Sequence, residues 1–415
     1  MTPQAEPREL LPATGHRGRR AARLAVIGGL SSFGPLSLDL YLPALPRVAT
    51  ALHASDGITQ LSVSGCLIGL AAGQLVLGPA GDRFGRRRPL LAGVGLWTVA
   101  ALACAFAPTA TALITLRVIQ GFGGAAGLVL GRAVIRDLYE DSALARAFAV
   151  VSVLSSIAPA VAPVAGGVLL HVMSWRGLFV VLTGAGAVLI AGTVLYLPES
   201  LPPGQRRPGG LRDMAALSRS LGTDRQFIAG ATIFALSGAM LFTYISLSST
   251  VLQHEYGLSP GAFAGVFALN SVGLIVAGSA TVRLLHRVPP RLLLWAALVT
   301  AVISAGGLCA AVIAGGPLWA LLVPLCLCVS TVGTIFPTAT NLAMLGHRDA
   351  AGAGSALLGG GQYAVGGLAG PVVSLAGSSA TSMSVGMGVA AVAALASYRI
   401  LPDRKAAPPR QNPLG

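Results

Sequence analysis

The sequence has few charged side chains. Asp, Glu, Lys and Arg together make up 10% of its 415 residues, while hydrophobic residues make up 54%. A soluble domain carries about 25% charged residues. Because so few charges cannot cover a water-soluble body of this size, lipid must solvate much of the surface. The composition therefore predicts an integral membrane protein.

Lysine is nearly absent, since Lys405 is the only one, and no G-x-x-x-x-G-K-[ST] phosphate-binding loop occurs. ATP hydrolysis is therefore not expected to drive this protein, which leaves coupling to an ion gradient. The sequence also has no soluble domain, metal-ligand cluster or nucleophile–base set. These absences argue against a membrane enzyme or a receptor, and no cofactor is predicted.

Cysteine and histidine are scarce as well. The five cysteines all fall in predicted membrane spans and are interpreted as small apolar packing residues. Cys326 and Cys328 are two positions apart, so they face different directions on a helix, and no metal site is predicted. All six histidines fall in tails or loops, which argues against a buried histidine proton relay.

Long apolar runs, by contrast, recur along the whole chain. Each has about 20 residues, the length that crosses about 30 Å of hydrocarbon as a helix. A β-barrel would instead show segments of about ten residues with strict alternation. Twelve helical spans are predicted, at residues 24–43, 58–80, 89–107, 111–134, 145–170, 175–197, 227–252, 261–285, 292–314, 318–345, 353–377 and 381–401.

The net charge of +14 would suit a nucleic acid, but the positions of the basic residues argue against that partner. With a cytoplasmic N-terminus, 25 of the 28 Lys and Arg residues fall in tails, inward loops or inner helix ends. Arg47 and Arg176 fall on the other side, and Arg117 falls within a span. This is the positive-inside distribution, which predicts a multi-pass protein with both termini in the cytoplasm.

The two halves of the chain resemble each other. A shift of 200 residues superposes Arg83, Arg87 and Pro89 on Arg283, Arg287 and Pro289. Two parallel six-helix repeats can enclose a central cavity and expose it alternately as they rock. The stretch between the halves is rich in Pro, Gly and Arg and is interpreted as a linker. The predicted divisions are a tail (1–22), a helical bundle (23–197), the linker (198–225), a second bundle (226–401) and a tail (402–415).

The loop between the second and third spans carries the most specific motif. Residues 78–90 resemble the signature G-x-L-x-D-R-x-G-R-[RK] of the major facilitator superfamily, with Ala80 in place of Leu. The resemblance implies an all-α membrane protein with the twelve-helix major facilitator fold. It also implies a gating loop whose residues here are Gly78, Asp82, Arg83, Gly85 and Arg86.

Asp82 is the only acid in this basic loop, so we expect it to have a dedicated partner. In the superfamily that partner is the start of the eleventh helix, here near Ala351, whose positive dipole end attracts a carboxylate. The contact would latch the halves against outward opening and break during transport. The alternative is that Asp82 only neutralises neighbouring arginines.

Asp39 and Arg117 are the only acid and the only base predicted within spans. The run from Asp39 to Pro46 resembles the helix-one signature of the Bcr/CflA subfamily of drug exporters, and residues 113–124 resemble the superfamily's helix-four motif with its buried arginine. At 1.5 Å per residue, both lie about 21–22 Å above the inner face. We therefore predict a proton-coupling pair, with a purely structural ion pair as the alternative.

The fifth span resembles the G-P-x-x-G-G motif of antiporters in the superfamily, with Ala162 where Gly is usual. Its residues are Pro159, Pro163, Gly166 and Gly167. A bent helix with small residues for close packing fits equally. Polar and aromatic side chains in other spans are candidates for the substrate cavity, although each could instead bridge helices. They are Tyr41, Gln120, Tyr244, Asn341 and Gln362.

The resemblance implies proton-coupled export of small drug-like molecules, such as chloramphenicol, bicyclomycin or a sulfonamide. The expected partners are a small-molecule substrate, protons and the lipid bilayer, and a monomer in the inner membrane is expected. The alternative is an importer or a metabolite exporter of the same fold, because fold does not fix substrate. Asp39 would then bind a cationic solute.

Overall fold

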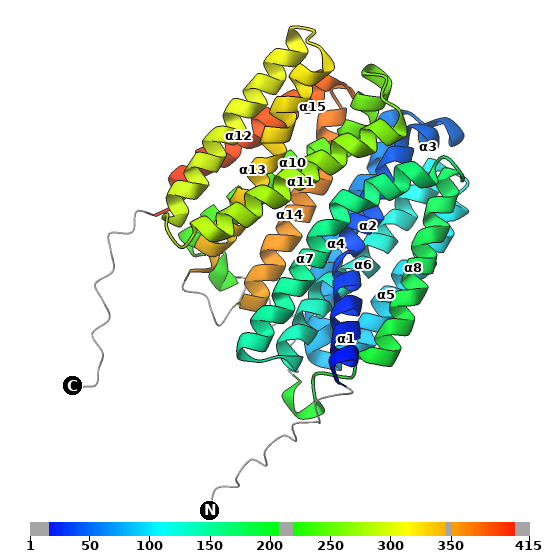
Figure 1. The fold of residues 1–415 in the computed structure, drawn as a ribbon, viewed down its shortest axis with the longest axis vertical. Coiled ribbons are helices and arrows are strands. Elements are labelled where there is room, and N and C mark those ends of the chain that lie inside the picture. Colours follow the sequence, from blue (N-terminus) through cyan, green and yellow to red (C-terminus); the bar gives the residue numbers. More distant parts are fainter. Residues whose placement is uncertain (1–15, 207–218, 346–350, 403–415) are drawn as a thin grey trace, which may run out of the picture.

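A computed structural model describes residues 16–206, 219–345 and 351–402, and within these ranges the regular structure is helical throughout (Figure 1). The first half contains α1 (His16–Ser31), α2 (Phe33–Asp39), η1 (Leu42–Ala44), α3 (Leu45–Ala51), α4 (Asp56–Phe84), α5 (Arg87–Ala105), α6 (Ala110–Leu138), α7 (Asp141–Leu169), α8 (Trp175–Tyr196) and η2 (Pro203–Gln205). The second half contains α10 (Arg225–Thr250), the π-helical turn η3 (Val251–Glu255), α11 (Pro260–Leu284), α12 (Pro290–Ile313), α13 (Leu318–Met344), α14 (Ala351–Ser374), α15 (Ala380–Ser397) and η5 (Tyr398–Ile400).

Each predicted span coincides with a helix or a bent pair of helices. Among the described residues, ten helices are long and apolar enough to cross a membrane, and one pair bent by 53° makes an eleventh. That pair joins α1 to α2 and α3. The remaining predicted span coincides with α14, a 24-residue helix whose many glycines lower its apolar character.

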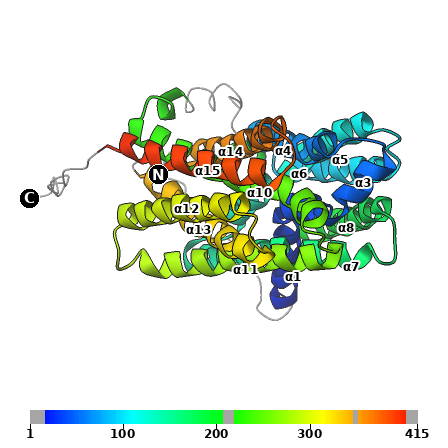
Figure 2. The same cartoon turned by 90° about the horizontal axis from the view of Figure 1, so that it is seen from above.

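The helices pack in two groups, which lie side by side in Figure 2. In the first group α4 and α5 pack on α6, and α5 also packs on α8. In the second, α10 packs on α13, α14 and α15. Two seams join the groups, one between α4 and α14 and the other between α7 and α11. The arrangement is that of two related six-helix units, because in each seam the second helix of one unit meets the fifth helix of the other.

Close helix approach within the first group depends on glycine. A Cβ added to Gly69 of α4 would run into the backbone of α6 at Val118, and one on Gly121 of α6 would run into the backbone of α4 at Cys66. Small residues at a crossing let two helix backbones touch, which is the usual packing device in a membrane, where no hydrophobic force brings helices together.

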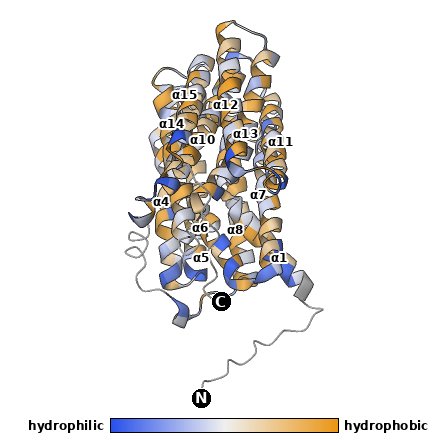
Figure 3. Ribbon diagram, turned by 90° about the vertical axis from the view of Figure 1, so that its left-hand side faces the viewer, coloured by the Kyte–Doolittle hydropathy of each residue, from blue (hydrophilic) through white to orange (hydrophobic). Residues whose placement is uncertain are grey.

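Hydrophobic residues predominate along most of the height of the helices (Figure 3). Large side chains such as Val99, Val188 and Ile303 are 66%, 71% and 69% exposed. Such a surface suits lipid and not water, in agreement with a membrane protein. We call the end at which α1 begins and α15 ends the terminal end, and the opposite end the far end.

Candidate functional site: a cavity between the two halves

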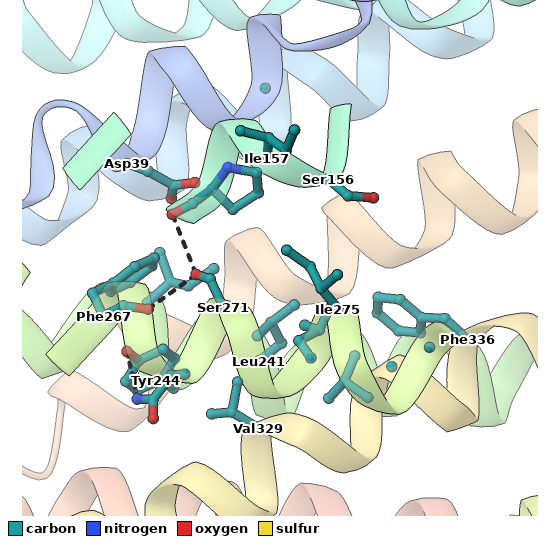
Figure 4. A pocket seen from close by; sticks show the side chains of 18 of the residues that line it. Asp39, Ser156, Ile157, Leu241, Tyr244, Phe267, Ser271, Ile275, Val329 and Phe336 are labelled. Atoms are coloured by element: carbon teal, nitrogen blue, oxygen red, sulfur yellow. Dashed lines mark hydrogen bonds between the residues drawn. The ribbon is translucent and has the colours of Figure 1, made fainter. Parts of the chain in front are cut away.

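A cavity of about 610 Å³ lies between the two halves, lined by residues of α2, α7, α10, α11, α13 and α14 (Figure 4). Most of the lining side chains are apolar, among them Leu241, Phe267, Ile275 and Phe336. The polar ones are few and come from both halves. They are Asp39, Ser152, Ser156, Tyr244, Asn270, Ser271, Ser279, Gln362 and Tyr363.

Asp39 is the only carboxylate among the described residues that line this cavity. It is the last residue of α2, is 4% exposed, and forms no hydrogen bond or ion pair with any described residue. The helix that carries it is held firmly. Trp97 Nε1 donates a hydrogen bond to Ser37 Oγ at 2.7 Å, and the Trp97 ring stacks on Phe33 at 4.2 Å. The site is therefore a fixed carboxylate that faces a mostly apolar space.

Arg117 does not pair with Asp39, so the predicted ion pair is wrong for this conformation. Its buried guanidinium donates to Gln120 Oε1 at 2.7 Å and to Ser62 O at 3.4 Å, and it lies 5.1 Å from the ring centre of Tyr41. Equal depth along the membrane normal does not fix the direction in which a side chain points. Arg117 points toward α4 and α8, whereas Asp39 faces the cavity.

The predicted cavity residues divide into two sets. Tyr244 and Gln362 line the cavity, whereas Tyr41 and Gln120 are fully buried around Arg117 and do not. Asn341 is also outside the lining, and its side chain is exposed near the terminal end of α13. For Tyr41 and Gln120 the prediction of a cavity position is wrong in this conformation, because a polar residue in a span can pack between helices instead. Asn341 lies one helical turn past the lining residue Pro337, so a cavity position for Asn341 stays a prediction.

The sequence prediction missed Asn270 and Ser271 of α11. Asn270 Nδ2 donates to the Tyr244 hydroxyl at 2.9 Å, and the Tyr244 ring stacks on Phe267 with ring centres 5.3 Å apart. Ser271 Oγ donates to Pro159 O at 3.2 Å. Two adjacent polar residues in the middle of the mostly apolar span 261–285 were the signal available in the sequence.

The helix-five motif packs α7 against both halves. Pro159 lines the cavity and accepts the hydrogen bond from Ser271, while Pro163 and Gly166 are buried. Gly166 lies against the backbone of Leu40, next to Asp39. A Cβ added to Gly167 would lie 3.2 Å from Ala264 Cβ of α11. The motif therefore lets α7 fit closely between α2 and α11.

The far end of the cavity is closed by polar contacts between the halves. They join Ser249 Oγ to Leu42 O (2.6 Å), Gln253 Nε2 to Pro43 O (3.4 Å), Ser374 Oγ to Gln60 Oε1 (2.6 Å) and His254 Nδ1 to Asp56 Oδ2 (3.3 Å). In the other direction the lining reaches Val282, two residues before the terminal end of α11. The cavity therefore extends toward the terminal end.

The family model described as "Major Facilitator Superfamily" matches residues 27–371. The chain belongs to the major facilitator superfamily. It is 35% identical over 390 residues to the "Uncharacterized MFS-type transporter YdgK" of Bacillus subtilis, which covers 93% of this chain and 96% of that protein. It is 28% identical over 382 residues to a "Bicyclomycin resistance protein homolog" of Haemophilus influenzae, covering 92% and 96%.

The "Multidrug resistance protein MdtL" of Escherichia coli is 29% identical over 237 residues, which cover 57% of this chain and 60% of that protein. These relatives confirm the resemblance to Bcr/CflA-type transporters. Among solved structures, a D-xylose–proton symporter has the same fold, with a TM-score of 0.73 at 15% identity over 92% of this chain and 97% of that one. This major facilitator protein is thus a multi-pass transporter of small molecules and not an enzyme.

The superfamily's loop signature forms an ionic cluster at the terminal end of the first half. Arg86 Nη1 lies 2.6 Å from Asp82 Oδ1, and Arg86 Nε lies 3.0 Å from Asp137 Oδ2 of α6. The predicted contact between Asp82 and the start of α14 is not formed with the described residues of that helix. With the far end closed, Asp82 is satisfied within its own half, so the expected latch against outward opening is absent from this conformation.

Gly85 and Glu199 complete this cluster. Gly85 has φ +86°, a left-handed conformation that favours glycine, and ends α4. Glu199 accepts backbone hydrogen bonds from Arg86 at 2.8 Å, Arg87 at 3.3 Å and Leu201 at 3.1 Å. Burial acts to raise the pKa of Glu199, but these three N–H donors and the charge of nearby Arg206 together lower it. The loop is thereby tied to the chain that follows α8.

Proposed function

We propose that this transporter exports small drug-like molecules across the bacterial inner membrane in exchange for protons, as a monomer that works by alternating access. The observation that carries the proposal is Asp39, a carboxylate without a described partner on the wall of an otherwise largely apolar cavity. A carboxylate there can take up and release a proton, and each change alters the charge that a bound molecule meets. The relatives named for bicyclomycin and multidrug resistance support a drug-like substrate.

Arg117 has an indirect part in this proposal. Its guanidinium lies 5.1 Å from the ring centre of Tyr41, two residues after Asp39, and neither Arg117 nor Tyr41 lines the cavity. Tyr41 also shares a hydrogen bond with Ser62 of α4 at 3.1 Å. Arg117 is thus a positioning residue that fixes the segment after α2, and Asp39 is the group that exchanges the proton.

The proposal also assigns the terminal end to the cytoplasm, because the sequence prediction puts 25 of the 28 basic residues in tails, loops or helix ends on the same side of the membrane as the start of the first span. The cavity then faces the cytoplasm, as the uptake step of an exporter requires.

Reporter fusions after Pro108, Gly316 and Ser379 should read as external. A cytoplasmic signal at two of these three sites would reverse the orientation and, with it, the direction in which the cavity faces.

The function itself is tested in an efflux-deficient bacterial host. Expression should raise resistance to at least one compound in a panel that includes bicyclomycin, chloramphenicol and a sulfonamide, and a protonophore should abolish the accumulation difference. In everted vesicles with an imposed pH gradient, adding that compound should release protons. Increased sensitivity of the host would instead indicate uptake, and an unchanged panel with no proton release would contradict drug export.

A further inference from the structure

The two seams between the halves differ in how far they are closed. The α4/α14 seam is closed along most of its length. At one end Ser374 of α14 bonds to Gln60 of α4, and at the other a Cβ added to Gly360 of α14 would lie 3.6 Å from Leu75 Cδ2 of α4. Between these points an added Cβ on Gly367 would lie 3.1 Å from Ile68 Cγ1. The fifteen residues of α4 from Gln60 to Leu75 span about 22 Å of helix. This flank therefore separates the cavity from lipid over most of the bilayer core.

The α7/α11 seam is closed only toward the far end. Its last polar contact joins Ser271 Oγ to Pro159 O, and beyond that point both helices present a continuous stripe to the cavity. The stripe of α7 is Ser152, Val153, Ser156 and Ile157, and the stripe of α11 is Leu274, Ile275, Gly278, Ser279 and Val282. The α11 stripe is about 12 Å long at 1.5 Å per residue.

The side chains along this opening are both cavity-lining and exposed. Val153 is 59% exposed, Ile157 is 47% exposed and Val282 is 56% exposed. Val161 lies on the same face of α7 as Ile157, one helical turn nearer the far end. It is 54% exposed but lies outside the cavity lining. The apolar face of α7 thus continues from the lipid-facing surface into the cavity. In Figure 1, α7 and α11 diverge toward the terminal end, and α14 is seen between them.

We propose that this opening is a lateral portal through which the cavity takes substrate from the terminal-side leaflet of the bilayer. The substrates that fit are amphiphiles that dissolve in lipid, because an apolar body can slide along the valine and isoleucine side chains without losing its apolar surroundings. Their polar end then meets Asp39 and Asn270 at the inner end of the path. The role of the portal in substrate uptake rests on the proposed transport function, whereas the experiment below measures access to the cavity without any transport.

The portal is tested by labelling and not by transport. Purified protein in liposomes is illuminated with a small apolar aryl diazirine that partitions into lipid, with glutathione present to quench reagent in water. Cavity residues Leu241 and Phe336 should be labelled in the unmodified protein. The variant Val153→Trp/Val282→Trp should lose that labelling, since two indoles narrow the opening, whereas Val168→Trp, a 62% exposed control on α7 outside the lining, should keep it.

A second pair, Ser152→Trp/Ser279→Trp, guards against a folding defect in the first, because both positions are exposed and line the same opening. Absence of label at Leu241 and Phe336 in the unmodified protein would overturn the portal. So would labelling that persists in both double variants. A labelled cavity in a protein that moves no drug would keep the portal and contradict the proposed function, so the two failures are distinguishable.

Discussion

Replacing Asp39 with asparagine is expected to abolish proton-driven efflux while the protein stays folded in the membrane. Asparagine has nearly the same size but cannot release a proton. Because Asp39 forms no hydrogen bond or ion pair with a described residue, the exchange breaks no such contact. In everted vesicles under an imposed pH gradient, drug-induced proton release should fall to the level of vesicles without the protein. Substrate binding to the purified variant should partly survive.

The matched control is Ser156→Ala, which changes another polar residue of the same cavity without removing a titratable group. It should retain most of the exchange. Asp39→Glu keeps the carboxyl group but moves it by one methylene, so it should retain a fraction. Wild-type exchange by the Asp39→Asn protein would make Asp39 a structural residue and would require the proton to travel elsewhere.

Replacing Arg117 with alanine is expected to have the larger effect on folding. The guanidinium is fully buried, so its loss leaves Gln120 Oε1 without this donor and empties the space beside the rings of Tyr41 and Phe179. Breaking a buried polar network and opening a cavity each cost about 3 kcal/mol or more in water-soluble proteins. Arg117→Lys should rescue little, because lysine keeps the charge but loses the planar fork. Yield and thermal stability of the purified protein in detergent measure both effects.

The double variant Arg117→Ala/Asp39→Asn decides why Arg117 matters. If Arg117 acted as the counter-ion of Asp39, neutralising the acid would relieve the damage of Arg117→Ala. The structure separates the two residues, so no rescue of stability is expected. Recovery of wild-type stability in the double variant would show that the two charges do pair in a state other than this one.

The fold was predictable because its cause is local in the sequence. Apolar runs of about 20 residues can only be satisfied as spanning helices in lipid, where every backbone group must bond within its own segment. The loop signature at residues 78–90 then narrowed that class to one family, and the family model covers residues 27–371. The bent first span was less visible, because α1, α2 and α3 together form one crossing.

Cavity residues were predicted less well because a polar residue in a span has several possible neighbours. Tyr244 and Gln362 line the cavity, but Gln120 bonds to Arg117 one turn away and Asn341 lies outside the lining. Asn270 was missed although it is the partner of Tyr244. Sequence spacing gives the face of a helix on which a residue lies, but not the helix that this face will meet.

The sequence by itself determined that this protein is a helical membrane transporter with one acid and one base at similar depth, because composition, span length and charge position are properties of the chain. Only the tertiary structure decided that Arg117 turns away from Asp39, and that the α7/α11 seam opens while the α4/α14 seam stays closed. Those outcomes depend on the rotation and tilt of each helix against its neighbours. Packing between segments far apart in the chain sets both quantities, and no local pattern records them.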